Sequence, residues 1–156
     1  MAAIEGIKQI DLTKVDVSAF KQQNSGCIVL THDNRILLQY RPDNWRTFPG
    51  MLATFGGHIE TNEPPLNAIV RELQEELGAT AKPDDLIGLG VVTEVITQHT
   101  ELVHLYFWHD EQNTITDCYE GEAQYFDNIS GALANPKLMD DVRWTLIECQ
   151  NRRLLG

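Results

Sequence analysis

Long apolar runs are missing from this 156-residue chain. The longest uncharged apolar runs, residues 86–93 and 102–108, fall far short of the roughly 20 residues that a membrane helix needs. Residues 1–9 carry charges and lack the apolar stretch of about 7–15 residues found in secretory signals. We therefore expect no membrane association and a cytoplasmic location.

Cysteine is also scarce. Cys27, Cys118 and Cys149 are an odd number of cysteines without a Cys-x-x-Cys pair, so the sequence predicts neither a disulfide framework nor a thiolate zinc site. The five histidines show no His-x-x-His spacing, so a zinc site of another kind is not expected either. We expect three reduced thiols, with Cys27 and Cys149 buried.

Positive charge is in short supply as well. The chain has 12 Lys and Arg against 23 Asp and Glu, for a formal charge of −11. Such an excess of acid repels phosphate backbones, whereas nucleic-acid-binding proteins concentrate Lys and Arg on one face. We therefore expect no stable nucleic-acid partner. A solvated acidic surface is the ordinary explanation of such a charge, so the position of the carboxylates is the informative feature.

Residues 1–156 contain no repeat, low-complexity tract or linker, so we expect one domain, with residues 1–24 as an N-terminal extension or edge strand. Apolar and β-branched runs predict two hairpins, with turns at 32–34 and 99–100. The last predicted strand alternates apolar residues with polar or aromatic ones, which predicts one apolar and one mixed face. The predicted strands are residues 26–30, 35–40, 52–55, 87–97 and 102–108.

Three helices are predicted, at 65–77, 129–134 and 138–154. In the first, apolar residues recur at helical spacing on one arc, while Pro65 suits the first helical position and Gly78 the position just past the end. Hairpins combined with helices in this order predict an α+β fold, an α/β/α sandwich around a central mixed sheet. The apolar arc of the first helix consists of Leu66, Ile69, Val70, Leu73 and Leu77.

Three carboxylates share one face of the helix predicted at 65–77. Glu72, Glu75 and Glu76 stand at i, i+3 and i+4 and close to the helix C-terminus, where the helix dipole also disfavours anions. Carboxylates at this spacing repel by about 0.2–0.5 kcal/mol. A hard divalent cation such as Mg²⁺ would relieve the repulsion, but a solvated acidic face would tolerate it. The helix spacing leaves both interpretations open.

The segment before this helix extends the pattern. The sequence reads Gly-x5-Glu-x7-Arg-Glu-Leu-x-Glu-Glu-x-Gly-Ala over residues 57–79. This pattern resembles the signature of the Nudix hydrolases and matches it at every fixed position. The flanking hairpins and the C-terminal helix also look like the α/β/α sandwich of that family. The fixed positions are Gly57, Glu63, Arg71, Glu72, Leu73, Glu75, Glu76, Gly78 and Ala79.

The resemblance implies a metal centre on the helix. Glu75 and Glu76 would bind the divalent cations, Mg²⁺ or Mn²⁺, and the carbonyl of Gly56 or Gly57 would add an oxygen ligand. Glu72 would be either a further ligand or the base for the attacking water, since its role differs between family members.

The other fixed residues would support this centre. Arg71 would orient Glu72 through a charge-assisted hydrogen bond. Glu63 would hold the junction between loop and helix, and Gly78 would end the helix. Pro64 departs from relatives that often carry a capping Ser or Thr there, which bears on the entry into the helix more than on the chemistry.

Many relatives recruit one more acid from a downstream loop, as ligand or base. Here the candidates are Glu122, which we favour, and Glu120, with Glu94 and Glu101 behind them. Two basic residues before Phe48, namely Arg41 and Arg46, are candidates for binding terminal phosphates, although each would also serve as a plain surface charge. Candidates for stacking on a base or lining the mouth of the site are Trp45, Phe48, His58, Tyr106 and Trp108.

The family resemblance implies hydrolysis of a nucleoside diphosphate linked to another group, by attack of water on a phosphorus. Signals of the ADP-ribose, dinucleoside-polyphosphate and NADH-type members are absent, so elimination favours a pyrophosphohydrolase of nucleoside triphosphates or modified nucleotides. Three alternatives stay open: a catalytically silent nucleotide sensor, an ADP-ribose or nucleotide-sugar hydrolase without the usual signal, and an isoprenoid diphosphate isomerase. The partner would be a small nucleotide polyphosphate, and the chain a monomer or homodimer.

Overall fold

One eight-stranded mixed sheet forms the centre of the molecule. The computed structural model describes residues 4–156. The strand order is β1-β6-β7-β2-β3-β4, while β5 pairs with β2 and β8 with β3. Strands β2 and β7 run parallel, and the other strand pairs of the described chain are antiparallel. The strands are β1 (Ile7–Gln9), β2 (Gln22–Leu30), β3 (Ile36–Tyr40), β4 (Leu52–Ala53), β5 (Phe55–His58), β6 (Ile87–Glu94), β7 (Glu101–His109) and β8 (Glu122–Phe126).

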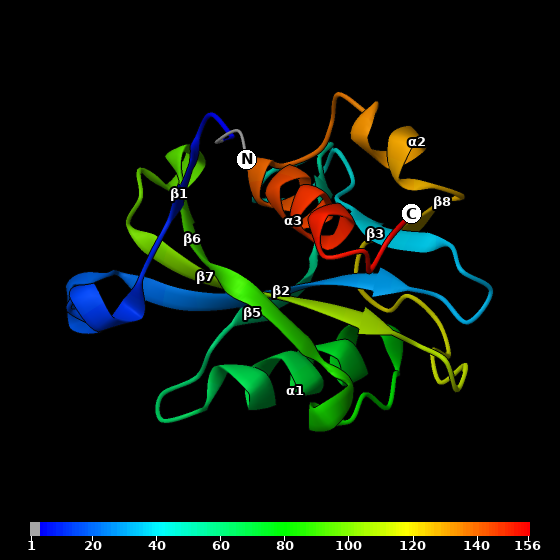
Figure 1. The fold of residues 1–156 in the computed structure, drawn as a ribbon, viewed down its shortest axis with the longest axis horizontal. Helices are drawn as coiled ribbons and strands as arrows, with labels where there is room; N and C mark the ends of the chain where they lie inside the picture. Colours follow the sequence, from blue (N-terminus) through cyan, green and yellow to red (C-terminus); the bar gives the residue numbers. More distant parts are fainter. Residues whose placement is uncertain (1–3) are drawn as a thin grey trace.

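Helices cover both faces of this sheet (Figure 1). Helix α1 (Pro65–Leu77) lies on one face, and α2 (Ile129–Leu133) and α3 (Asp140–Asn151) lie on the other. Each layer has its own apolar core: one joins α1 to residues of β2, β3 and β5, and the other joins α2 and α3 to the opposite side of the sheet. The predicted α/β/α sandwich is confirmed. Short 3₁₀ helices lie in the connections between these elements, at Leu12–Lys14, Val17–Ala19, Pro83–Asp85 and Val95–Thr97.

Helix α1 has the bounds that the sequence predicts. Pro65 occupies its first turn, and Gly78 ends it in the left-handed conformation with φ 61°. A Cβ at Gly78 would lie 1.9 Å from Thr116 Oγ1, so only glycine fits this helix end. Pro64 supplies no side-chain cap, and the Glu63 carboxylate instead accepts a hydrogen bond from the Glu60 N–H at 3.0 Å. The departure at Pro64 therefore leaves the helix start intact.

Helix α3 is shorter than the predicted 138–154. The Leu52 N–H donates to Lys137 O at 2.9 Å and the Met139 N–H donates to Leu52 O at 3.0 Å, so residues before Asp140 are extended along β4. The apolar spacing that includes Leu138 continues across this bridge and does not mark the helix start. At the N-terminus, β1 is the expected edge strand, paired with β6.

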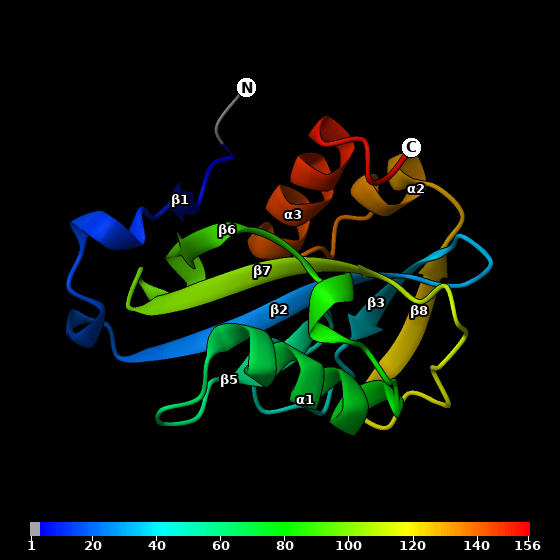
Figure 2. The same cartoon turned by 60° about the horizontal axis from the view of Figure 1, so that its bottom comes forward.

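Strand β7 differs from its predicted mixed face. Trp108 is 2% exposed and packs in the core beneath α1, and Tyr106 packs against the same core. His104 is buried too. Both faces are covered because helices lie on both sides of the sheet, as the turned view in Figure 2 shows. Tyr106 and Trp108 are therefore part of the packing around α1.

The remaining expectations concern the segment at 119–125, the thiols and the membrane. The sequence predicts a loop at 119–125, but strand β8 begins at Glu122 within this segment and pairs with β3. The three cysteines are free, with Cys27 and Cys149 buried as expected. Within residues 4–156, the helices are too short or too polar to span a bilayer.

Candidate active site

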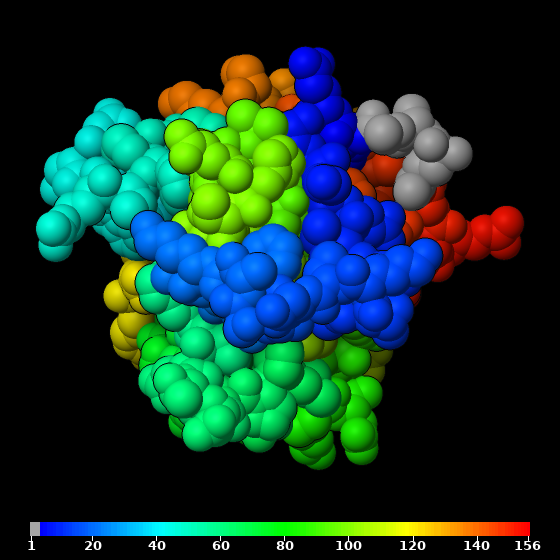
Figure 3. Space-filling model, turned by 90° about the vertical axis from the view of Figure 1, so that its left-hand side faces the viewer, coloured from blue at the N-terminus to red at the C-terminus, as the bar shows by residue number. Residues whose placement is uncertain are grey.

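A cavity of about 370 Å³ lies between the N-terminal half of β2, the loop after β3, the end of β6 and the first turn of α3. The connection from β1 to β2, coloured blue, crosses the face shown in Figure 3. A cavity of this size is in the range that accepts small organic ligands. Its lining includes Ser25, Gln39, Arg41, Phe48, Gly56, Gly57, His58 and Glu120 near the α1 motif, and Asn24, Glu94, Glu101, Val103, Met139 and Asp141 elsewhere.

Glu76 is the most deeply buried of the α1 carboxyls, with 1% of its surface exposed. The Gly56 N–H donates to its Oε1 at 3.0 Å, and Gln39 Nε2 donates to its Oε2 at 3.3 Å. Burial raises the pKa of Glu76 to about 9, and the nearby charges of Glu120 and Glu72 push it the same way. No cationic side chain pairs with Glu76 among the described residues, so this buried group lacks the positive charge it would need to ionise at neutral pH.

Glu72 lies against the backbone of Gly57. A Cβ at Gly57 would lie 2.8 Å from Glu72 Oε1, so glycine lets this carboxylate approach the strand. Gly56 has φ 149°, and a Cβ there would lie 2.0 Å from Ser25 O. Arg71 Nη1 donates to Glu72 Oε1 at 3.0 Å. Burial raises the pKa of Glu72, and Arg71 acts in the opposite direction.

Arg71 joins the loop before α1 to the helix. Its Nε and Nη2 donate to Glu63 Oε2 and Oε1 at 2.8 and 2.9 Å, a bidentate pair. Its Nη2 also donates to His58 O at 3.1 Å. These bonds hold the pKa of Glu63 down at about 2. Arg71 therefore positions Glu72 while Glu63 anchors Arg71.

Glu75 and the two downstream acids lie in different places. The Glu75 side chain is 57% exposed, and its carboxylate lies 3.4 Å from Arg71 Nη1. Glu120 lines the cavity, and its charge raises the pKa of both Glu76 and Glu72. Glu122 is exposed on β8 opposite Tyr40 and is not among the cavity residues. Of the two downstream acids that the sequence names, Glu120 lines the cavity, whereas Glu122, the one it favours, does not.

Arg41 is the basic side chain held at this end of the cavity. Its Nε donates to Thr47 O at 2.8 Å, and its guanidinium lies over the rings of Trp45 and Phe48, 4.4 and 5.8 Å from their centres. Partial burial lowers the pKa of Arg41, and the nearby charges of Glu120 and Glu76 raise it. Arg46 is not among the residues that line the cavity, and Tyr106 and Trp108 face the α1 core, so none of these three is placed to contact a ligand there.

The donor set fits a hard divalent cation. Glu72, Glu76 and Glu120 supply carboxylate oxygens, and the backbone at Gly56 and Gly57 adjoins them. Within residues 4–156 no three acidic, His or Cys side chains form a ready metal cage. Mg²⁺ does not require such a cage, because it commonly takes one or two carboxylates together with substrate phosphates and water.

A second acidic group, Glu94 and Asp141, lines the same cavity; the sequence names Glu94 only as a lower-ranked downstream acid and does not single out Asp141. Glu94 and Asp141 are 4% and 6% exposed, and the Asp141 N–H donates to Glu94 Oε1 at 3.0 Å. Their side chains are hydrogen-bonded, and burial raises the pKa of Glu94 to about 9 and that of Asp141 to about 6. The available signal was weak: Asp140 and Asp141 stand in the first turn of α3, where acidic residues also suit an ordinary helix start.

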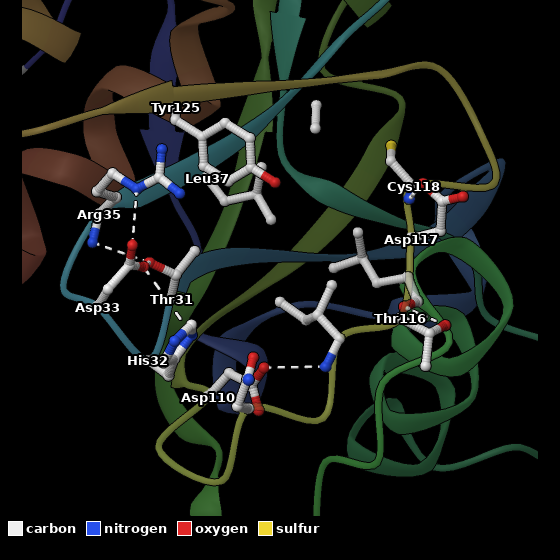
Figure 4. A pocket seen from close by; sticks show the side chains of 14 residues that line it. Thr31, His32, Asp33, Arg35, Leu37, Asp110, Thr116, Asp117, Cys118 and Tyr125 are labelled. Atoms are coloured by element: carbon white, nitrogen blue, oxygen red, sulfur yellow. Dashed lines mark hydrogen bonds and ion pairs between the residues drawn. The ribbon is translucent and has the colours of Figure 1, made fainter.

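Another cavity, of about 270 Å³, lies at the C-terminal end of α1, and none of the α1 carboxylates lines it (Figure 4). Its charged groups are already satisfied. Arg35 Nε donates to Asp33 Oδ2 at 3.1 Å and its guanidinium lies 4.2 Å from the centre of the Tyr125 ring. The Asp110 carboxylate accepts from the N–H groups of Thr114 and Ile115 at 2.8 and 3.0 Å. The charged residues that line this cavity are therefore paired with neighbouring protein groups.

Comparisons with known proteins agree on one family. A family model described as a NUDIX domain matches residues 21–145. CTP pyrophosphohydrolase of Escherichia coli is 30% identical over 116 residues, covering 73% of this chain and 82% of that protein. The m7GpppN-mRNA hydrolase NUDT17 of Danio rerio is 39% identical over 54 residues, covering 35% of this chain and 18% of that protein. The crystal structure of a mutT/nudix family protein from Listeria innocua has a TM-score of 0.68 at 22% identity, covering 86% of this chain and 95% of that one, which shows the shared fold.

Proposed function

Because this chain belongs to the Nudix hydrolase family, whose members act on small nucleotides with divalent metal ions, we propose that it is a pyrophosphohydrolase of nucleoside triphosphates. The observation that carries the proposal is the convergence of Glu72, Glu76 and Glu120 beside Gly56 and Gly57. The two glycines, Glu120 and Arg41 line the cavity at this end. The similarity to a CTP pyrophosphohydrolase over most of that protein's length supports a triphosphate substrate.

The residues of this chain would bind and orient the polyphosphate. Bound Mg²⁺ or Mn²⁺ supplies the positive charge that offsets the phosphate oxygens and promotes loss of a proton from water. That ion would be held by Glu72, Glu76 and Glu120 together with a carbonyl of Gly56 or Gly57. The charge of Glu75 raises the pKa of Glu72. Arg41 would contact the phosphates farther from the nucleoside.

Water attack then needs a proton acceptor and a fixed geometry. Glu72 and Glu120 are the two carboxylates of the group that we assign as candidates for the base, because Glu76 is tied to the Gly56 N–H and buried. Arg71 keeps Glu72 in place, so its contribution is positioning. Since phosphoryl transfer asks little covalent chemistry of the protein, position and charge neutralisation supply most of the rate.

A matched pair of variants tests the proposal. With purified protein, Mg²⁺ and a panel of nucleoside triphosphates, we expect Glu76→Gln and Glu120→Gln to lower kcat by about 100-fold or more, because each removes a charged oxygen at the site. Glu122→Gln makes the same chemical change on β8 outside the cavity and should retain activity. Wild-type rates for Glu120→Gln, or no hydrolysis of any nucleotide by the wild type, would refute the assignment; the latter would favour the silent sensor.

A further inference from the structure

We propose that Gln39 is a positioning residue that holds Glu120 beside Glu76, so that the loop before β8 brings its acid to the α1 carboxylates. The inference rests on the proposed function, in which Glu120 helps to bind the divalent cation, and it adds the residue that keeps this acid in place. Gln39 lies on β3 with 3% of its surface exposed. Its side chain contacts other protein groups and acts through them.

Glu120 lies in a loop that is anchored on either side of it. Before it, the Tyr119 N–H donates to Glu76 O in the last turn of α1 at 2.7 Å. After it, Glu122 of β8 pairs with Tyr40 of β3. Glu120 itself is exposed, and exposed loop residues are more mobile than strand residues. A carboxylate that binds a cation needs a fixed position, so the backbone of Glu120 requires a contact of its own.

The Gln39 amide supplies that contact. Its Nε2 donates to Glu120 O at 3.1 Å and to Glu76 Oε2 at 3.3 Å. Its Oε1 accepts a hydrogen bond from Arg41 Nη1 at 3.3 Å. The orientation of the amide follows from these partners, because the reversed amide would place an acceptor oxygen against two other acceptors. One buried side chain therefore links the Glu120 backbone, the Glu76 carboxyl group and the Arg41 guanidinium.

Gly121 lets the loop come close enough for this contact. It follows Glu120 directly and has φ 71°, and a Cβ there would lie 2.9 Å from Gln39 Cγ and 2.9 Å from Tyr40 O. Glycine adopts this left-handed conformation without strain and has no Cβ to meet β3. The hydrogen bond to Glu120 and the close approach of Gly121 are separate observations, and both place this segment against Gln39.

Repulsion among the carboxylates gives this contact its consequence for the cation. The charge of Glu120 raises the pKa of both Glu76 and Glu72. Once ionised, these groups repel one another, and without a cation the repulsion drives the loop away from α1. The hydrogen bonds of Gln39 oppose that movement. Ligands that are held together beforehand bind a cation more tightly, because less conformational freedom is lost on binding.

Binding of Mn²⁺ to the full chain, without nucleotide, tests the proposal. With free Mn²⁺ followed by its EPR signal, Gln39→Leu should raise the Kd for Mn²⁺ by about tenfold or more, because it keeps the size of the side chain but removes the amide. Gln39→Asn shortens the side chain by one methylene group, should also raise the Kd, and serves if Gln39→Leu does not fold. Gln124→Leu, the control, makes the same change on the neighbouring strand β8 outside the cavity and should leave the Kd unchanged.

A double-mutant cycle separates positioning from general support of the fold. Glu120→Gln removes the charged oxygen that Gln39 is proposed to hold, so in that background Gln39→Leu should raise the Kd for Mn²⁺ by only about threefold or less. A residue that merely stabilises the fold would raise the Kd by the same factor in both backgrounds. Equal factors in the two backgrounds, or a wild-type Kd in the Gln39 variants, would overturn the proposal.

Because the cycle uses no nucleotide, its outcome is separate from that of the proposed function. If the wild type hydrolyses no nucleotide but the effects of Gln39→Leu and Glu120→Gln on the Kd are coupled, the proposed function fails while the positioning role stands. If the wild type hydrolyses nucleoside triphosphates but Gln39→Leu binds Mn²⁺ as the wild type does, the positioning role fails while the proposed function stands.

Discussion

Two groups of acidic side chains differ in what surrounds them, one at the glycines of β5 and one lining the cavity beside α3. Glu72, Glu76 and Glu120 face one another beside glycine backbone, with Arg71 and Arg41 nearby. Glu94 and Asp141 instead lie against each other, with the Asp141 N–H donating to Glu94 Oε1, and burial raises the pKa of both carboxyls. The proposed function assigns the first group to a divalent cation, whereas the second group is hydrogen-bonded within the protein.

The largest expected effect disturbs the first group through its backbone. In Gly57→Ala the new Cβ would lie 2.8 Å from Glu72 Oε1, so the carboxylate must move. A displacement near 1 Å at a reacting centre costs about 100-fold in rate, so we expect kcat to fall by about that factor with a nearly unchanged Tm. Gly88→Ala is the control, since its Cβ would meet Tyr106 at an ordinary 3.8 Å. Equal kcat in the two variants would contradict the close approach of Glu72.

A smaller effect follows from loosening the support of Glu72. Glu63→Gln loses the charge that anchors Arg71 through two hydrogen bonds, so Arg71 should hold Glu72 less firmly. Loss of a partner behind a metal ligand commonly costs about 10- to 100-fold in metal affinity or activity. We expect the Mg²⁺ concentration for half-maximal activity to rise. Glu60→Gln, an exposed change in the same loop, should leave this Mg²⁺ concentration unchanged. The same response in both variants would argue that the Glu63–Arg71 pair does not position Glu72.

The second group should affect stability more than rate. An unfolded Glu has a pKa of about 4.3, whereas folded Glu94 has a raised pKa of about 9. Between these values the folded state holds a proton that the unfolded state has released, so the free energy of unfolding falls as pH rises. In urea titrations at about pH 6 and about pH 9, Glu94→Gln should lose less stability than the wild type. A parallel decline would show that Glu94 does not hold the proton.

The smallest effect lies outside both groups. Arg35→Ala removes the contact with Tyr125 and a half-exposed ion pair with Asp33. Such interactions contribute about 0.5–1 kcal/mol each at the surface, so Tm should fall by a few degrees and kcat/KM for CTP should not change. A large loss of activity would show that the cavity in Figure 4 takes part in the reaction.

The two carboxyl groups also differ in how far the sequence predicts them. The motif from Gly57 to Ala79 places its residues on one helix and one loop, so local spacing carries the information, and the bounds of α1 are confirmed. Glu94 and Asp141 are 47 positions apart and meet only when β6 and α3 pack. The sequence ranks Glu120 below Glu122 for the same reason: the pairing of β8 with β3, a contact between distant segments, decides which of the two acids lines the cavity.

Burial produced the remaining differences. Tyr106 and Trp108 lie on the face of β7 that the sequence predicts to be mixed, but helices cover both faces of this strand. Leu138 continues the apolar spacing of α3 although it lies in the extended bridge to Leu52. In both cases distant segments bury the side chain. A local sequence pattern carries no information about those segments.

Strand β2 has one further consequence. Its backbone pairs Asn24 with His58 of β5 on one side and with Val103 of β7 on the other, next to the pairing of Ser25 with Gly57. The distance from the glycines beside the α1 carboxylates to the β7 side of the cavity is thus set by a hydrogen-bonded ladder. Side chains that line the cavity can be exchanged without changing that backbone spacing.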